Sequence, residues 1–172
     1  TVRKLFMEDI RIYCENDNQY HKAVKGTKLK DLAPDLYEGK AIAALVDNRL
    51  KEMDFSIIDP ATIRFIGYDH PDGRRTYIRS LCFVLQNAVR EMFPDKVLSI
   101  DYSLPSGLYC EIREVKPMDD GRPDVYFITD QELEDLKTRM QQIVDADLPF
   151  TKVKMNFEEA QKLFAANNQT EK

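Results

Sequence analysis

Alternating apolar and polar positions predict that the first third of the chain folds mainly as short β-strands. Ile10, Ile12 and Cys14 recur at a spacing of two, which is typical of a strand with one buried face. A cluster of Asn and Asp residues at positions 16–18 indicates a turn, and residues 20–25 form a second predicted strand. Together these segments predict a β-hairpin.

A short helix is predicted after this hairpin. Thr27 is a candidate N-cap, and Leu29, Leu32 and Ala33 would form the buried face of the helix. Pro34 lies within this stretch, so the helix is either short or restarts with Pro34 in its first turn.

Further strands complete a predicted compact unit over residues 9–67. The expected elements are an apolar strand over 41–46, a turn at Asp47 and Asn48, a returning strand over 49–53 and a last strand over 62–66. The resulting order is strand, strand, helix, strand, short strand, strand, which is the order of a β-grasp fold.

The most informative stretch is a long amphipathic helix predicted over residues 75–93 and ending before Pro94. Its apolar stripe recurs at steps of three and four and consists of Ile78, Leu81, Cys82, Leu85, Ala88, Val89 and Met92. At about 100° per residue, Phe83 points well away from the centre of that stripe. Phe83 is therefore either exposed or covered by a second layer. We favour a second layer, which implies that this face lines a cleft or an interdomain seam.

The rest of the chain predicts a hairpin, two helices and one more strand. The expected elements are strands over 97–104 and 108–112 joined by a tight turn at 105–107, a helix starting at Thr129, a strand over 151–155 and a final helix. Thr129 and Glu132 form a capping-box pattern at the start of the first of these helices. The apolar stripe of that helix consists of Leu133, Leu136, Met140, Ile143 and Val144.

The final helix has its own capping pattern. Asn156 and Glu159 are the predicted capping residues, and Ala160, Leu163 and Phe164 would face inward.

Composition narrows the class of protein. Of the 172 residues, 43% are hydrophobic and 32% are charged, which predicts a chain that folds around a core. The net charge of -5 argues against an overall electrostatic nucleic-acid binder but leaves room for a local basic patch. No apolar run approaches a membrane span and no apolar signal segment opens the chain, so we expect a cytoplasmic protein that does not enter a membrane.

The metal-binding residue types are few and scattered. The three cysteines, Cys14, Cys82 and Cys110, form no Cys-x-x-Cys pair, which fits a reducing compartment and predicts that each is a small buried apolar residue. With only two histidines, His21 and His70, no cluster has metal-ligand spacing, so no metal site is predicted. The chain also lacks both standard glycine-rich loops for nucleotide phosphates.

The run Arg79-Ser-Leu-Cys-Phe83, followed by Val-Leu-Gln-Asn-Ala-Val-Arg-Glu-Met-Phe-Pro94, resembles the helix of the second domain of threonyl-tRNA synthetases. That family helix opens with His-Ser-x-Ala-His and ends with Leu-Tyr-Pro. In this alignment Arg79 and Phe83 take the two histidine positions, and Ser80 matches the family serine. A guanidinium has no lone pair and a benzyl ring has no donor atom for a metal. The resemblance therefore implies that a hydrolytic activity based on these histidines is lost.

Shorter motifs extend the resemblance over residues 9–167. In the first unit, Lys25-Gly26-Thr27 and Val46-Asp-Asn-Arg-Leu50 resemble the helix entry and the Val-Asn-Gly-x-Leu turn of TGS domains. The turn glycine is either replaced by Asn48 or displaced, and because Asn tolerates a positive φ, the turn can survive.

The later part of the chain carries three more of these motifs. Gly107-Leu108-Tyr109 resembles the Gly-Phe-Tyr-Tyr hairpin of the synthetases, and Pro149-Phe150 and Glu158-Glu159-Ala160 match two later motifs.

These observations predict an α+β fold with two parts. The first is a β-grasp, TGS-like domain over 1–67, and residues 68–73 form a linker. The second is an α/β module resembling the synthetase editing domain over 74–172, which we expect to be truncated at its C-terminus.

Two functions are compatible with this resemblance. Some bacterial uridine kinase-like proteins carry a TGS domain and a synthetase-like second domain ahead of a P-loop kinase domain, and this chain resembles that N-terminal half. It would then be a non-catalytic binding or regulatory region, inactive itself, whose partner is its own C-terminal uridine kinase domain, which uses ATP and Mg. The alternative is a tRNA-binding or editing-type domain related to threonyl-tRNA synthetase, without the metal-binding histidines. Neither alternative requires a cofactor in this fragment, and RNA or a small nucleotide is the candidate ligand.

The candidate ligand-binding residues surround the altered histidine motif. They are Arg75, Arg79, Phe83 and Tyr109. Arg79 suits a phosphate or carboxylate, or else is a solvated helix residue. Phe83 is predicted to serve in packing rather than in stacking on a base. Tyr109 faces either the core or the cleft.

Overall fold

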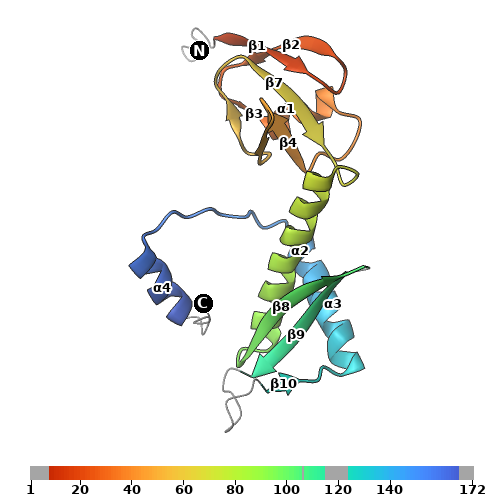
Figure 1. The fold of residues 1–172 in the computed structure, drawn as a ribbon, viewed down its shortest axis with the longest axis vertical. Helices are drawn as coiled ribbons and strands as arrows, with labels where there is room; N and C mark the ends of the chain where they lie inside the picture. Colours follow the sequence, from red (N-terminus) through yellow and green to blue (C-terminus); the bar gives the residue numbers. More distant parts are fainter. Residues whose placement is uncertain (1–7, 106, 115–123, 167–172) are drawn as a thin grey trace. The chain divides into compact units, whose positions relative to one another are not determined.

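A computed structural model describes residues 8–105, 107–114 and 124–166, and its chain divides into two compact units, Thr1–Ser80 and Leu81–Lys172. The boundary falls within the long helix α2, Pro71–Met92 (Figure 1). No helix in the described residues is long and apolar enough to cross a bilayer.

The first unit is built on a five-stranded mixed sheet. Its strands are β1 (Asp9–Cys14), β2 (Gln19–Val24), β4 (Ala43–Val46), β5 (Arg49–Lys51) and β7 (Ala61–Ile66). They lie in the order β2-β1-β7-β4-β5, and β1 and β7 run parallel while the other neighbours are antiparallel. The predicted hairpin and the three later strands are thus confirmed, with ends that differ by a few residues.

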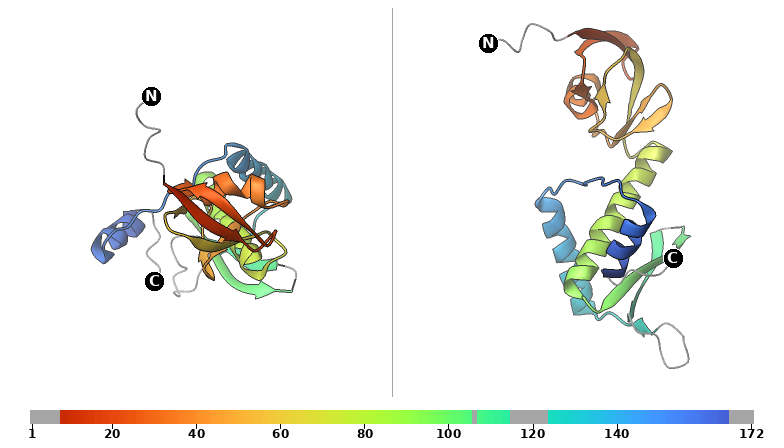
Figure 2. Two further views of the ribbon diagram at one scale, coloured as in Figure 1. Left: turned by 90° about the horizontal axis from the view of Figure 1, so that it is seen from above. Right: turned by 90° about the vertical axis from the view of Figure 1, so that its left-hand side faces the viewer.

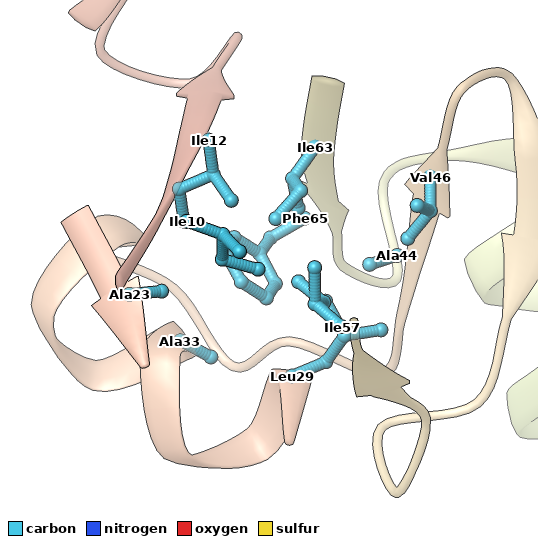
Figure 3. Packing of buried hydrophobic residues seen from close by; sticks show 10 residues of the cluster. All are labelled: Ile10, Ile12, Ala23, Leu29, Ala33, Ala44, Val46, Ile57, Ile63 and Phe65. Carbon is cyan, nitrogen blue, oxygen red and sulfur yellow. The ribbon is translucent and has the colours of Figure 1, made fainter. Parts of the chain in front are cut away.

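One face of this sheet is covered by the helix α1 (Leu29–Leu36) and by a small two-stranded sheet of β3 (Thr27–Lys28) and β6 (Ser56–Ile57). The side chains of Leu29, Ile57 and Phe65 are almost completely buried between these layers. Figure 3 shows ten side chains from the strands and from α1 converging on this core. The structure is therefore of the mixed α/β kind.

The predicted entry of α1 was wrong at its cap. Thr27 does not cap the helix, because it belongs to β3 and its hydroxyl donates to the carbonyl oxygen of Val24 at 2.7 Å. The N-cap is Lys28, which makes no side-chain capping bond. Pro34 lies inside α1, so the helix is short and does not restart there.

The turn between β4 and β5 is confirmed as a two-residue hairpin loop. Asp47 and Asn48 have φ values of 48° and 61°, and Val46 pairs with Arg49 across the loop. Two consecutive residues with positive φ match the twist of the flanking strands, and Asn and Asp tolerate this conformation better than most residues.

Helix α2 begins at Pro71, four residues before the predicted start, so the second half of the predicted linker is helical. Proline suits a first helical turn because its missing N–H is not needed there. Gly73 allows this early start: a Cβ atom at Gly73 would lie 1.9 Å from the carbonyl oxygen of Gly67.

The second unit packs a hairpin and a helix around the C-terminal half of α2. Its strands are β8 (Lys96–Leu104), β9 (Gly107–Glu114) and β10 (Val125–Tyr126), in the order β10-β9-β8, and its main further helix is α3 (Asp130–Asp145). The buried residues are Ala88, Val89, Ile112 and Leu136, from α2, β9 and α3. The ribbon shows the C-terminal half of α2 between the β8–β9 hairpin and α3 (Figure 2). The predicted strands are confirmed, while Ser106 of the predicted turn lies outside the described residues.

The capping predictions for the two later helices are confirmed. The Thr129 hydroxyl accepts from the Glu132 amide at 3.3 Å, and the Glu132 carboxylate accepts from the Thr129 amide at 2.9 Å. At the last helix, α4 (Phe157–Ala166), the Asn156 side chain accepts from the Glu159 amide at 2.8 Å.

Two predictions about the C-terminal segment were wrong. Residues 151–155 form no strand, since they pair with no other strand. Leu163 and Phe164 of α4 are about half exposed rather than inward-facing, with exposed fractions of 48% and 50%. Of the α3 stripe, Leu136 is buried, while Val144 at the other end is exposed.

Candidate functional site

Arg75 and Arg79 lie one turn apart on the part of α2 that belongs to the first unit. The Arg75 guanidinium donates to the carboxylate of Asp72, in the same helical turn, and remains largely exposed. Arg79 is exposed. Because the Asp72 carboxylate already holds Arg75, Arg79 is the better placed of the two to meet an anion from solvent.

The serine of the altered histidine motif is used within the helix. The Ser80 hydroxyl donates to the Thr76 carbonyl oxygen at 3.0 Å, and the Thr76 hydroxyl donates to the Asp72 carbonyl oxygen at 2.8 Å. Both are bonds to the preceding turn of the helix. In this state the Ser80 hydroxyl proton is committed to the backbone, which leaves only the oxygen lone pairs to an incoming group.

Phe83 lies on the second-unit part of α2 and is 61% exposed. Its ring meets Phe150 edge-on, with centroids 6.0 Å apart and planes inclined by 62°. Phe150, itself 68% exposed, thus partly covers Phe83 without burying it. Among the described residues, Phe150 therefore provides a partial cover for Phe83, whose side chain stays largely exposed.

Tyr109 lies on the face of β9 opposite to the buried Ile112, and a β-bulge in β8 brings a second tyrosine onto the same face. The register of β8 and β9 shifts between Ile100 and Tyr102, so Asp101 is an extra residue in β8. An extra residue reverses the faces of the side chains that follow it. Tyr102 therefore joins Tyr109 on the outer face, where the two rings stack with centroids 4.8 Å apart and planes inclined by 10°.

A charged network surrounds this tyrosine stack. The Tyr109 hydroxyl donates to Glu111 at 2.8 Å, and the Arg113 guanidinium bonds both Glu111, at 2.8 Å, and Asp101, at 3.1 Å. The bond to Glu111 raises the pKa of Tyr109, and the same bond, followed by Arg113, lowers the pKa of Glu111. Tyr109 is thus held as a neutral donor with its ring against Tyr102.

The four predicted site residues fall in separate units: Arg75 and Arg79 in the first, Phe83 and Tyr109 in the second. Within the second unit, Phe83 contacts Phe150 and Tyr109 contacts Tyr102, so each of the two belongs to its own aromatic pair. Their assignment to one ligand site stays a prediction.

The described residues contain no group of three or more His, Cys, Asp or Glu side chains arranged for a metal ion. The two histidines instead serve local turns, with His21 contacting Asp17 at 2.7 Å and His70 accepting from the Asp72 amide at 3.2 Å. The residues at the altered histidine motif, Arg79 and Phe83, do not fit a metal.

The cysteines do not share one environment. Cys14 is buried, as predicted, but Cys110 is exposed, so that prediction was wrong for Cys110. Desolvation and, to a smaller extent, the neighbouring Cys82 raise the pKa of Cys110. A raised pKa disfavours the thiolate, which argues against a nucleophilic role.

Two aromatic groups were missed in the sequence. Tyr102 was missed because its face depends on the bulge, which no local pattern predicts. On the first unit, Tyr13 and Tyr20 lie opposite each other on β1 and β2 with ring centroids 5.0 Å apart. The available signal was the alternation of Arg11 and Tyr13 with the buried residues of β1.

Comparison with known proteins finds relatives among threonine–tRNA ligases. The chain is 24% identical over 147 residues to the ligase of Desulforamulus reducens, covering 84% of this chain and 22% of the ligase. It is 28% identical over 160 residues to that of Ehrlichia chaffeensis, covering 91% of this chain and 24% of the ligase. It is 26% identical over 125 residues to the ligase of Symbiobacterium thermophilum, covering 73% of this chain and 18% of the ligase.

These comparisons show a distant relationship. No protein family profile matches the chain. The chain spans about a fifth to a quarter of the length of the relatives described above. Homology to threonine–tRNA ligases at this level makes a module of the TGS and synthetase second-domain kind plausible for the chain.

Proposed function

We propose that this chain is a tRNA-binding module of the threonine–tRNA ligase type that lacks hydrolytic chemistry. The observation that carries the proposal is a similarity to these ligases over most of the chain, combined with Arg79 and Phe83 at the two positions where the resembling helix has histidines. Similarity supports a retained RNA-facing surface, and the two replacements remove the lone pairs that histidines would offer.

The fold proposal is that the first unit is a TGS-like β-grasp domain and the second resembles the synthetase second domain. The order β2-β1-β7-β4-β5, with a parallel central pair and one helix packed on the sheet, supports the first assignment. The hairpin β8–β9 beside α2, with Tyr109 following Gly107, supports the second.

The side chains on α2 suit binding better than catalysis. Arg79 offers a permanently charged planar donor that can pair with a phosphate in a bidentate manner. The open face of Phe83 can meet a base or a ribose. A general base is missing from this pair, because neither side chain can accept a proton at neutral pH.

The test has two measurements on the intact chain. Binding of a threonine-acceptor tRNA is followed by fluorescence anisotropy, and deacylation of the same tRNA carrying a wrong amino acid is followed with and without Zn²⁺. We expect saturable binding and no turnover above the uncatalysed rate in either condition.

Variants connect the measurements to the site. Arg79→Ala is expected to weaken tRNA binding about five- to tenfold, as for loss of one charge-assisted contact. Arg90→Ala is the matched control, because Arg90 lies near the other end of α2 and bonds Asn87. Turnover by the unaltered chain would refute the loss of hydrolysis, and absence of tRNA binding would refute the proposed function.

The nucleoside-kinase hypothesis has no corresponding support. The relatives described above are ligases and favour the tRNA-binding alternative. A kinase domain as partner, with ATP and Mg, stays a prediction, as does the expected absence of a cofactor in this chain.

A further inference from the structure

The five-stranded sheet of the first unit has a second face that is not part of its core. Side chains along a strand alternate between the two faces of a sheet. Ile10, Ile12 and Cys14 of β1 are buried, so the intervening Arg11 and Tyr13 lie on the other face. This outer face also carries Tyr20 and Lys22 of β2, which pair with Tyr13 and Arg11, and Arg64 of β7. We call these five residues the outer-face patch.

The aromatic part of the patch is an open stack. The Arg11 guanidinium lies 3.7 Å from the centroid of the Tyr20 ring. The Tyr13 ring lies beside Tyr20, tilted by 54°. Tyr20 is nevertheless 61% exposed. A base can therefore stack on free ring surface of Tyr20 or on the outer plane of the Arg11 guanidinium.

The charged part of the patch has two cations in direct opposition. Arg11 and Lys22 are register partners across the antiparallel pair β1–β2. Like charges placed directly opposite each other on a sheet repel. A phosphate group between or above them would remove this repulsion and would be bound by both side chains.

The cations of the patch have no ion-pair partner among the described residues. Within residues 8–105, 107–114 and 124–166, no carboxylate forms an ion pair with Arg11, Lys22 or Arg64. By contrast, Lys28 and Lys30, on the α1 side of the sheet, both pair with Asp54, at 2.8 and 3.0 Å. In a chain with a net charge of -5, three cations on one sheet face that form no ion pair within the described part of the chain make a local basic surface.

Two carboxylates limit where an anion can lie. Asp9 begins β1 and Glu15 directly follows it, and both are exposed. The favourable position for a phosphate is therefore the middle of β1 and β2, above Arg11 and Lys22. Tyr20 lies two residues from Lys22 along β2, which corresponds to the spacing of a base beside its own backbone phosphate.

We propose that the outer-face patch binds single-stranded RNA, with a phosphate on Arg11 and Lys22 and an unpaired base stacked on Tyr20. Only unpaired bases expose a face for stacking, so the aromatic half of the patch selects single strands. This inference deepens the proposed tRNA-binding function by naming a face of the first unit and the kind of RNA segment it takes. It rests on side chains other than Arg79 and Phe83.

The experiment measures binding of a fluorescently labelled single-stranded RNA dodecamer to the intact chain by anisotropy, over a series of salt concentrations. Lys22→Gln is expected to weaken binding several-fold and to reduce the slope of log K against log salt by about 0.7, the value for one phosphate contact on a single strand. Lys30→Gln is the matched control, since it removes one positive charge from the opposite side of the sheet.

The stacking half of the proposal has its own pair of variants. Tyr20→Leu is expected to weaken binding by at least about fivefold, whereas Tyr20→Phe keeps a ring and should bind like the unaltered chain. Thermal unfolding of each variant shows whether the fold is kept. Asp9→Asn should tighten binding, because it removes a negative charge beside the patch.

Several outcomes would overturn the inference. The first is that Lys22→Gln and Lys30→Gln weaken RNA binding equally. The second is that a duplex of the same sequence binds as tightly as the single strand. The third is that an acidic peptide of equal charge displaces the RNA completely. The result is separable from the proposed function. If tRNA binds but the Tyr20 and Lys22 variants bind it and the dodecamer unchanged, only this inference fails. If the dodecamer binds through the patch while tRNA does not, only the proposed function fails.

Discussion

The two units differ in how completely they bury their apolar side chains. The first unit contains a core cluster of ten buried residues that includes Phe65. The described part of the second unit buries four residues and leaves large side chains exposed, among them Phe127 at 86% and Phe157 at 79%. Apolar surface that stays in water contributes nothing to folding. We therefore expect the first unit to resist unfolding and the second to open at lower denaturant concentration.

The largest expected effect comes from the centre of the first core. Phe65→Ala removes a ring that is 1% exposed and packs against Tyr37 with centroids 6.3 Å apart. The expected cost is about 3–5 kcal/mol of unfolding free energy, from lost burial and the cavity left behind. Urea unfolding followed by tyrosine fluorescence measures the unfolding midpoint of each unit. The substitution should lower the midpoint of the more stable, first unit. An unchanged midpoint would contradict the assignment of the core.

A smaller effect is expected in the second core. Leu136→Ala removes the buried residue of α3, and its cost should lie near the lower end of the range for such changes, about 2 kcal/mol, because this core is small and partly open. Leu133→Ala is the control on the same helix, since Leu133 is exposed, and it should change stability by less than about 0.5 kcal/mol. Equal effects of the two changes would show that α3 is not packed through Leu136.

The cap of α3 offers the next test. Thr129→Ala removes the hydroxyl that accepts from the Glu132 amide, and the expected cost is about 1 kcal/mol. Thr138→Ala is the matched control, because the Thr138 hydroxyl only donates to the carbonyl of Glu134 in the preceding turn. That substitution should leave the helix unchanged or slightly more stable. Circular dichroism during thermal unfolding measures both.

The length of an element and the presence of a pairing partner explain which elements the sequence predicted. Strands β1 and β7 were predicted because apolar residues recur at a spacing of two, at Ile10, Ile12 and Cys14 in β1 and at Ile63 and Phe65 in β7. Strands β3 and β6 were missed because two residues cannot display a period. The segment 151–155 alternates Lys152, Val153 and Lys154 like a strand, but a strand also needs a partner for its backbone groups, and sequence does not show whether one is present.

The candidate site likewise has features that the sequence predicts and features that depend on the tertiary fold. The positions of Arg79 and Phe83 on α2 follow from helical periodicity, and the structure places them on exposed parts of the helix. The partner of Phe83 could not be predicted, because Phe150 is 67 residues away in sequence and reaches it only through the tertiary fold. The outward face of Tyr102 depends on the bulge at Asp101, which is a property of the strand pair rather than of either strand.

The smallest expected effect is a loss of stability of the first unit at acidic pH. Hydrogen bonds from Lys28 and then Lys30 lower the pKa of Asp54 from 3.8 to about 2. A carboxyl group whose pKa is lowered on folding stabilises the fold above its unfolded pKa, and this stabilisation disappears as the pH falls toward the folded value. The first unit should therefore lose a small part of its stability between about pH 4 and pH 2. Asp54→Asn should flatten this part of the curve, and because Asp54 is exposed and screened by solvent, added salt should flatten it as well. If Asp54→Asn loses as much stability between about pH 4 and pH 2 as the unaltered chain, other carboxylates of the first unit govern its response to acid.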